Sequence, residues 1–302
     1  MSFPCGFIVI DKPSGVASSA MVSLVRRLTG VRRVGHVGTL DPLATGVLPV
    51  AVGHATRLVE YLDDTHKAYV ARVRFGESTT TGDAEGDVTA RGDASALTAD
   101  AVRAALPAFI GEIEQRPPLF SAIKLAGKPL YRYARAGEDV APEPRRVRVH
   151  ALDLRSFEPG DGAAPEAEVD VRCGRGTYVR SLARDLGEAL GVGAHLVALR
   201  RTASAGFTAD EAHPPQRLEA AAREGRLESL LIAPDRAVED RPAAILDGRG
   251  SALVTQGREL RFGRASASGL CRAYDLDGRF LGLLASAGNL AWRPLKVFQP
   301  PC

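Results

Sequence analysis

The chain has 302 residues, of which 45% are hydrophobic and 25% charged, with a formal net charge of +3. This ordinary globular composition can bury a sizeable core and excludes an intrinsically disordered chain, and the length favours one large domain with a small one. Most of the 39 basic residues are arginines, whose planar guanidinium suits phosphate. Composition therefore favours a nucleic-acid partner only slightly over a merely solvated basic surface.

The sequence carries no metal-binding pattern and no targeting segment. Its four cysteines are scattered, with no CxxC pair and no histidine at ligand spacing, so we expect neither a disulfide framework nor a zinc site. No apolar run reaches the roughly 18 residues of a membrane span. The opening MSFPCGFIVIDKPSG lacks a basic region before an apolar core. We expect a soluble, cytoplasmic protein.

The N-terminal third alternates short strands with helical segments. A strand is predicted at 7–10, before a turn cluster, and Ser18 or Ser19 can cap the helix that follows and ends at Gly30. A glycine-rich loop then leads into an apolar strand over 47–52. After a short helical stretch, residues 69–75 alternate as a half-buried strand does, with Tyr69 on the apolar side.

The middle of the chain contains two polar segments. Residues 77–92 lack the downstream glutamate of an EF-hand, so they do not predict a calcium loop. Thr98 caps a predicted helix. Residues 115–137, QRPPLFSAIKLAGKPLYRYARAG, interleave basic and aromatic side chains. Such a segment suits a flap over nucleic acid, although a packed surface hairpin explains it equally well.

The last part of the chain contains strands and one clear helix, and then changes to short strands separated by glycine turns. Strands are predicted around 147–154, 167–173 and 195–205; helices connect 211–230. Between the strands, Thr177 is the predicted N-cap of a helix whose start, with Arg175 and Arg180, is a natural anion site. From Pro234 onward, short strands separated by glycine turns predict a small all-β domain.

The loop from Gly35 to Val50, GHVGTLDPLATGVLPV, places one carboxylate among small residues. Its glycines permit close approaches that a side chain would block, and Pro42 biases Asp41 toward an extended conformation. Such a loop can hold a carboxylate against a ligand. Taken alone, an Asp-Pro step is more commonly a turn whose carboxylate binds nearby amides.

GHVGTLDPLATGVL resembles the signature loop of the TruB family of tRNA pseudouridine synthases, which has dyskerin-type relatives. Further matching motifs are Asp11-Lys12-Pro13, Lys67-Ala68-Tyr69, Gln115-Arg116-Pro117-Pro118, Gly176-Thr177-Tyr178-Val179-Arg180 and Leu199-Arg200-Arg201. The C-terminal part more weakly resembles a PUA RNA-binding module. Thr80 departs from the family pattern, which usually carries aspartate there, whereas the acidic Asp83 further along the loop is retained.

The resemblance implies an α+β fold. A pseudouridine synthase catalytic domain, with a mixed, largely antiparallel central sheet flanked by helices, is expected over residues 1–235, with a flap insertion at about 115–145. A small all-β PUA-like domain is expected over 236–302.

The same resemblance implies that uridine 55 in the T-arm loop of tRNA is isomerised to pseudouridine after base flipping. Asp41 is the expected nucleophile, attacking either the sugar or the base; the sequence leaves that choice open. Arg180 is the expected partner that keeps Asp41 ionised. Tyr69 is expected to stack on the flipped base and either to take or to relay the carbon-5 proton.

Other positions are assigned to substrate binding or to the lining of the site. His36 is expected to fill the space that the base vacates or to steady the loop. The remaining assigned residues are Lys12, Thr39, Leu40, Arg175, Tyr178 and Leu199. No cofactor or metal is expected, because the isomerisation is redox-neutral. The expected partner is tRNA, with no protein partner implied, and the expected state is a monomer.

Two alternatives remain open at the level of sequence. One is a pseudouridine synthase that acts on another RNA, as guide-directed dyskerin relatives do. The other is an RNA chaperone that opens and refolds the tRNA elbow, for which the chemistry at Asp41 would be dispensable.

Overall fold

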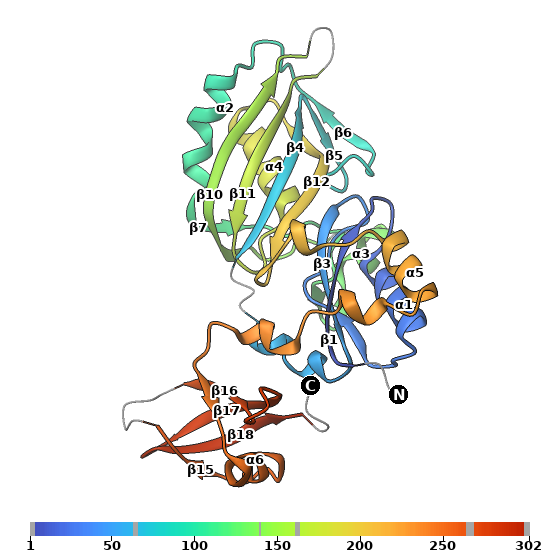
Figure 1. The fold of residues 1–302 in the computed structure, drawn as a ribbon. Helices are drawn as coiled ribbons and strands as arrows, with labels where there is room; N and C mark the ends of the chain where they lie inside the picture. The colour runs from blue at the N-terminus through green and yellow to red at the C-terminus, as the bar shows by residue number, and fades with distance from the viewer. Residues whose placement is uncertain (1–3, 63–65, 139, 161–163, 264–268, 299–302) are drawn as a thin grey trace.

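A computed structural model describes residues 4–62, 66–138, 140–160, 164–263 and 269–298 (Figure 1). Its main feature is a nine-stranded sheet with β1 (Gly6–Lys12), β2 (Val34–His36), β3 (Thr45–Val52), β4 (Lys67–Phe75), β7 (Gly111–Gln115), β10 (Arg145–Glu158), β11 (Glu166–Cys173), β12 (Ala194–Ser204) and β13 (Phe207–Thr208). The order along the sheet is β1-β3-β12-β4-β11-β10-β7, with β2 paired to β3 and β13 to β12.

The pairing is antiparallel except where β12 runs parallel to β3. That contact joins Arg200 to Thr45 and Arg201 to Gly46. Gly46 has a φ of +97°, and a Cβ built there would lie 2.2 Å from the carbonyl oxygen of Arg201. Only glycine lets the two strands meet at this point.

Helices cover one face of the sheet and one of its ends. The helices are α1 (Ser18–Thr29), α2 (Ala99–Ala105), α3 (Leu130–Arg135), α4 (Val179–Ala189) and α5 (Pro215–Arg223). Figure 1 shows α4 behind the long strands, and α1 and α5 beside β1 and β3. Apolar residues that alternate along β4 and recur along α4 meet in one core, with Val73, Phe75, Leu182 and Leu186 among them. Burial of these two stripes holds the sheet and α4 together.

Short elements complete this part of the chain. Two small hairpins pair β5 (Glu77–Thr79) with β6 (Val88–Arg91) and β8 (Lys124–Leu125) with β9 (Lys128–Pro129). Single turns of 3-10 helix lie at Gly53–Arg57, Val59–Tyr61, Leu106–Phe109, Ala209–Glu211, Leu227–Leu230 and Pro234–Val238.

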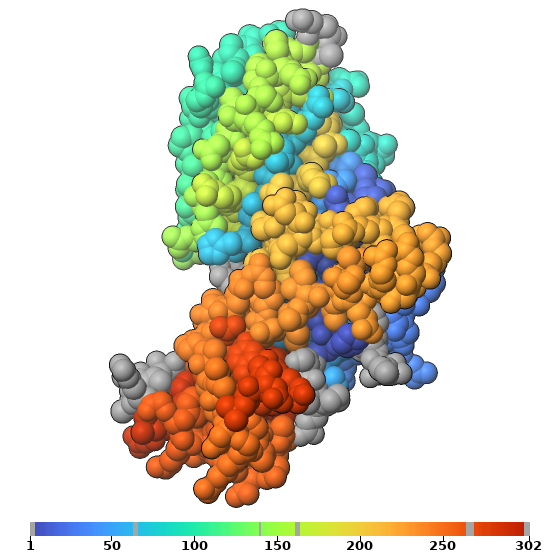
Figure 2. All heavy atoms as spheres, viewed as in Figure 1, coloured from blue at the N-terminus to red at the C-terminus, as the bar shows by residue number. Residues whose placement is uncertain are grey.

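The C-terminal part forms a second, five-stranded sheet. Its order is β14 (Ala243–Ile245), β16 (Leu270–Tyr274), β17 (Phe280–Gly288), β18 (Ala291–Val297) and β15 (Leu260–Arg261), with helix α6 at Gly248–Thr255. Figure 2 shows its orange-to-red atoms gathered at one end of the molecule. The small β domain and the mixed, largely antiparallel main sheet confirm the expected α+β architecture.

The small domain packs directly on the start of the chain. Phe280 and Phe298 share a buried cluster with Phe7 and other residues of the main domain. Arg57 donates a hydrogen bond of 2.7 Å to the carbonyl oxygen of Val297. The boundary at 235/236 itself remains a prediction.

Two predicted helix caps are wrong, and one is right. Thr98 does cap α2, accepting a hydrogen bond from the amide of Ala101. Helix α1 instead starts after Ala17 with no side-chain cap. Helix α4 starts at Val179, so Tyr178 occupies the N-cap position and Thr177 lies outside it. Ser18 instead bonds the main chain of Leu40, and Thr177 lines the cavity described below.

The cysteine expectation also needs a correction. Cys5 is disulfide-bonded, whereas Cys173 and Cys271 are buried cysteines that form no disulfide. Cys302 lies outside the described residues. Sequence spacing cannot show which distant cysteines a fold brings together. In the described part of the chain, no helix is long and apolar enough to cross a membrane.

Candidate active site

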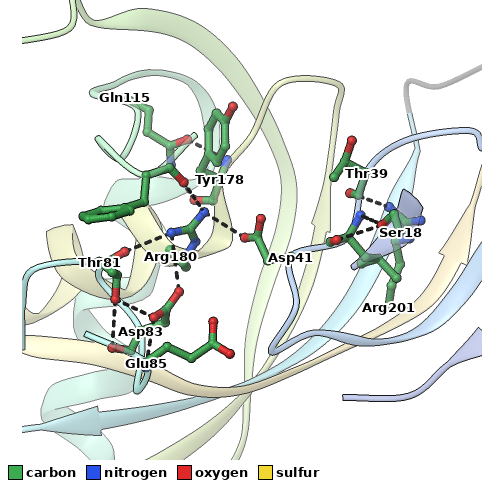
Figure 3. A network of polar contacts seen from close by, with 12 residues as sticks. Ser18, Thr39, Asp41, Thr81, Asp83, Glu85, Gln115, Tyr178, Arg180 and Arg201 are labelled. Carbon is green, nitrogen blue, oxygen red and sulfur yellow. Dashed lines mark hydrogen bonds and ion pairs between the residues drawn. The ribbon is translucent and has the colours of Figure 1, made fainter. Parts of the chain in front are cut away.

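Asp41 lies in the loop between β2 and β3, and three distant side chains hold the main chain on either side of it. Ser18 accepts a hydrogen bond from the amide of Leu40 at 2.9 Å and donates one to its carbonyl oxygen at 2.8 Å (Figure 3). Ser18 is 3% exposed, so both bonds are shielded from water. The residue before Asp41 is thereby fixed in position and orientation.

Arg201 holds the same loop from β12. Its guanidinium donates to the carbonyl oxygens of Val47 at 2.7 Å, Gly38 at 3.0 Å and Thr39 at 3.4 Å. The side chain is 0% exposed, and no ion pair to it is present among the described residues. Main-chain dipoles therefore provide its hydrogen-bond partners, which is how a buried cation avoids an unmet solvation cost.

Lys12 holds the other side of the loop from the end of β1. Its ammonium group donates to the carbonyl oxygens of Val16 at 2.7 Å, Pro13 at 2.8 Å and Pro42 at 3.1 Å. Burial lowers the pKa of Lys12 to about 8, although nearby Asp41 opposes this shift. The Lys12 side chain is 0% exposed and positions the loop in this structure, while its assigned role in RNA contact or site lining remains a prediction.

Arg180 joins Asp41 to a second carboxylate. From the first turn of α4, its guanidinium lies 2.9 Å from Asp41 Oδ2 and 3.4 Å from Asp83 Oδ2 (Figure 3). It also donates to the carbonyl oxygens of Thr81 and Phe120, each at 3.0 Å. Arg180 and Asp83 are almost fully buried, whereas the Asp41 side chain is 37% exposed. The exposed carboxylate is the one that a ligand can reach.

Asp83 is fixed by its own loop. It accepts hydrogen bonds from the Thr81 hydroxyl and from the Glu85 amide at 3.1 Å. Thr80, the departure from the family pattern, accepts a bond of 3.1 Å from the Asp87 amide. Thr80 thus closes the loop, while Asp83 carries the charge that reaches Arg180.

A cavity of about 490 Å³ opens beside Asp41, and most of the predicted site residues line it. Those residues are Thr39, Leu40, Asp41, Tyr69, Tyr178, Arg180 and Leu199. Tyr131 and Arg135 of the predicted flap also line it, and the Arg135 guanidinium lies 5.6 Å from the centre of the Tyr131 ring. The volume lies in the range of about 300–1,000 Å³ that small-molecule sites occupy.

Tyr178 is clamped through its main chain. The Gln115 side chain accepts from the Tyr178 amide at 2.8 Å and donates to its carbonyl oxygen at 3.1 Å. Burial raises the pKa of the Tyr178 phenol, and the nearby Asp41 carboxylate adds to that effect. The phenol therefore keeps its proton at neutral pH and can act as a hydrogen-bond donor.

Besides Lys12, two further predicted residues, His36 and Arg175, do not line this cavity. His36 is half-buried in β2, opposite Val50, and burial with the nearby Arg201 guanidinium lowers its pKa. Arg175 is exposed and lines a separate hollow with Arg146, Arg148 and His150. Neither residue contacts Asp41 in this structure, so their assigned roles in substrate binding remain predictions.

Sequence reasoning missed four residues that build the site. Ser18 and Arg201 fix the loop, Gln115 clamps Tyr178, and Asp83 is the second acid on Arg180. Gln115 and Arg201 belong to motifs quoted above, and Asp83 lies in the loop that contains Thr80, but only the fold shows what these side chains contact. Among the described residues, no group of three or more histidine, cysteine, aspartate or glutamate side chains could hold a metal ion.

Comparison with known protein families gives two adjoining matches. Residues 26–179 match the TruB family pseudouridylate synthase N-terminal domain, and residues 180–239 match the tRNA pseudouridylate synthase B C-terminal domain. The tRNA pseudouridine synthase B of Thiobacillus denitrificans is 47% identical over 291 residues, covering 96% of this chain and 95% of that protein. That of Arthrobacter sp. is 44% identical over 299 residues, covering 98% and 97%.

Solved structures with the same fold include an archaeal box H/ACA sRNP Nop10–Cbf5 complex. The Cbf5-like match has a TM-score of 0.71 at 25% identity and covers 98% of this chain and 86% of that chain. A Cbf5–Nop10–Gar1 complex gives a TM-score of 0.71 at 27% identity, covering 98% and 85%. Both similarities extend through the main sheet and the small β domain.

Proposed function

The chain belongs to the TruB family and is a tRNA pseudouridine synthase, and from that premise we propose that it converts uridine 55 in the T-arm loop of tRNA to pseudouridine. The observation that carries the proposal is the Asp41–Arg180 pair at the edge of the cavity, with a contact of 2.9 Å. We assign the reaction to the cytoplasm.

The reaction needs a nucleophile that a flipped nucleotide can reach. The bond from uracil N1 to the sugar breaks, the base turns, and a bond from C5 to the same sugar carbon forms. C5 then loses its proton, and N1 gains one. Asp41 serves as the nucleophile whether it attacks the sugar or the base, because each route needs an ionised, accessible carboxylate. The partial exposure of Asp41 and its contact with Arg180 fit both requirements.

Arg180 acts by position and charge. The guanidinium lies 2.9 Å from the Asp41 carboxylate and attracts it, and the buried Asp83 holds that cation in place. Removal of the uridine from its stack costs a few kcal/mol, which contacts inside the cavity must offset. Tyr69 and Leu199 supply apolar surface for the base, and Tyr69 either takes the C5 proton or relays it.

The rival functions make different demands. A chaperone that only opens and refolds the tRNA elbow requires no ion pair at a cavity edge, so the Asp41–Arg180–Asp83 arrangement favours catalysis. A pseudouridine synthase that acts on another RNA would use the same site, so only a comparison of RNA substrates distinguishes it from the proposed function.

The test measures tritium release from tRNA transcripts labelled at uracil C5, together with tRNA binding. The wild type is expected to release one tritium per tRNA, and Asp41→Asn to release none while it binds normally. A transcript with uridine 55 replaced by cytidine is the substrate control. Release that persists from this transcript refutes the position, and full activity in Asp41→Asn refutes the role of Asp41.

A further inference from the structure

Hydrogen-bonding atoms without a partner gather around the catalytic cavity. Among the described residues, the buried side-chain atoms that lack a hydrogen bond include Ser121 Oγ, Thr177 Oγ1 and Arg180 Nε. All three residues line the 490 Å³ cavity. Because buried polar groups in folded proteins nearly always find a partner, such a cluster at one cavity indicates groups that a ligand satisfies.

The two hydroxyls are built into rigid positions. Ser121 is 6% exposed, and its backbone is held by bonds from its own amide to Leu119 and from the Tyr131 amide to its carbonyl oxygen. Thr177 directly precedes Tyr178, whose main chain Gln115 clamps on both sides. Arg180 connects the two segments through its bond to the Phe120 carbonyl oxygen (Figure 3). Preorganised donors of this kind give directional recognition.

Other local uses of these hydroxyls do not apply. Thr177 precedes a helix, yet α4 has no side-chain cap, so its hydroxyl is not used for capping. The Ser121 hydroxyl lies near enough to the Tyr178 phenol to favour its ionised form and so to lower its pKa against the larger effect of burial, yet no hydrogen bond of normal geometry joins the two side chains. Both hydroxyls therefore remain available to a bound molecule.

We propose that Ser121 and Thr177 are specificity-determining residues that donate hydrogen bonds to the carbonyl oxygens of the flipped uracil. Uracil presents two carbonyl acceptors beside the N3–H group, and a serine or threonine hydroxyl can donate to the carbonyls. The inference rests on the proposed function, since it takes the occupant of the cavity to be the target uridine. It adds to Asp41 and Arg180 a pair of groups that recognise the base.

The test compares Ser121→Ala, Thr177→Val and the double variant with the wild type in single-turnover tritium release. Each single variant is expected to lose about ten-fold in rate, the equivalent of one hydrogen bond, with tRNA affinity within about two-fold of wild type. Ser229→Ala and Thr89→Val, which remove exposed hydroxyls from residues that do not line the cavity, are the matched controls. Thr177→Ser restores the hydroxyl and is expected to recover most of the rate.

Substrate analogues identify the atoms that the hydroxyls contact. A 2-thio or 4-thio target uridine replaces a carbonyl oxygen with a weaker acceptor, so the penalty of the matching variant is expected to shrink. A 2′-deoxy target is expected to leave both penalties unchanged. Penalties that vanish only on the 2′-deoxy target overturn the inference in favour of sugar recognition. Penalties unchanged on every analogue, or variants as fast as wild type, also overturn it.

Failure of the inference and failure of the proposed function give different results. Wild-type activity on the parent transcript tests the proposed function alone. The inference is read from the ratio of variant to wild-type rate, measured on whichever RNA the wild type modifies. A different target uridine therefore changes the substrate used, while a ratio near one contradicts the inference whatever that substrate is.

Discussion

We expect Asp83 to be necessary for the reaction, although it acts on Asp41 only through Arg180. Its carboxylate is 4% exposed and lies 3.4 Å from Arg180, which in turn contacts Asp41. At an effective dielectric of about 20, opposite unit charges about 4 Å apart attract by about 4 kcal/mol. Asparagine keeps the size of the side chain and part of the hydrogen bonding. We therefore expect Asp83→Asn to lose about 2–3 kcal/mol of interaction with Arg180.

A loss of 2–3 kcal/mol in the transition state slows the reaction roughly 30- to 150-fold. The assay is single-turnover tritium release, measured alongside tRNA binding and thermal unfolding. Asp87→Asn removes the same charge from an exposed position on the same loop, and it should retain the wild-type rate. If Asp83→Asn reacts within two-fold of wild type, the argument that Asp83 holds Arg180 for Asp41 is refuted.

Three further outcomes follow from the site and its loop. The single-turnover rate should decline as pH rises through about 8, where Lys12 loses its proton. The free energy of unfolding should not fall there on account of Lys12, because above this pH the unfolded protein binds more protons at Lys12 than the folded protein does. A rate that stays flat to about pH 9.5 would contradict the role of Lys12 in positioning the loop. Gly46→Ala should destabilise the fold by roughly 2–5 kcal/mol in chemical denaturation, because its Cβ would strike the Arg201 backbone, whereas Gly35→Ala, with open space, should be near neutral. Affinity for tRNA should fall steeply with salt in filter binding, and a flat dependence would contradict phosphate contacts.

The sequence predicts the elements better than the contacts of the site. Alternation over 69–75 and the helical stripe after Thr177 predict β4 and α4 because burial of an apolar face imposes those periods. No local pattern reveals that β12 runs parallel to β3, since that pairing joins residues about 150 positions apart. The pairing of Asp41 with Arg180 was predicted only from the motif, and the geometry agrees with it.

The polar side chains whose use differs from the prediction do so for one physical reason. Ser18 and Thr177 lie at or just before the starts of helices and carry hydroxyls, so local propensity predicts caps. In the fold, Ser18 instead bonds both main-chain groups of Leu40, and the Thr177 hydroxyl lies buried beside the cavity without a partner. Lys12 is assigned from the sequence to RNA contact or site lining, whereas in the fold its ammonium group donates hydrogen bonds to three carbonyl oxygens. Tertiary contacts decide how a polar side chain is used, and sequence spacing does not encode them.

The buried cations explain how a loop can present an acid to solvent without moving. Lys12 and Arg201 bind carbonyl oxygens on the two sides of Asp41, and Ser18 binds the residue before it. All of these bonds engage the main chain, so none of them occupies the Asp41 carboxylate. That carboxylate remains free to pair with Arg180 and to face the cavity. A reactive group is thus oriented by its backbone, which leaves its side chain available for chemistry.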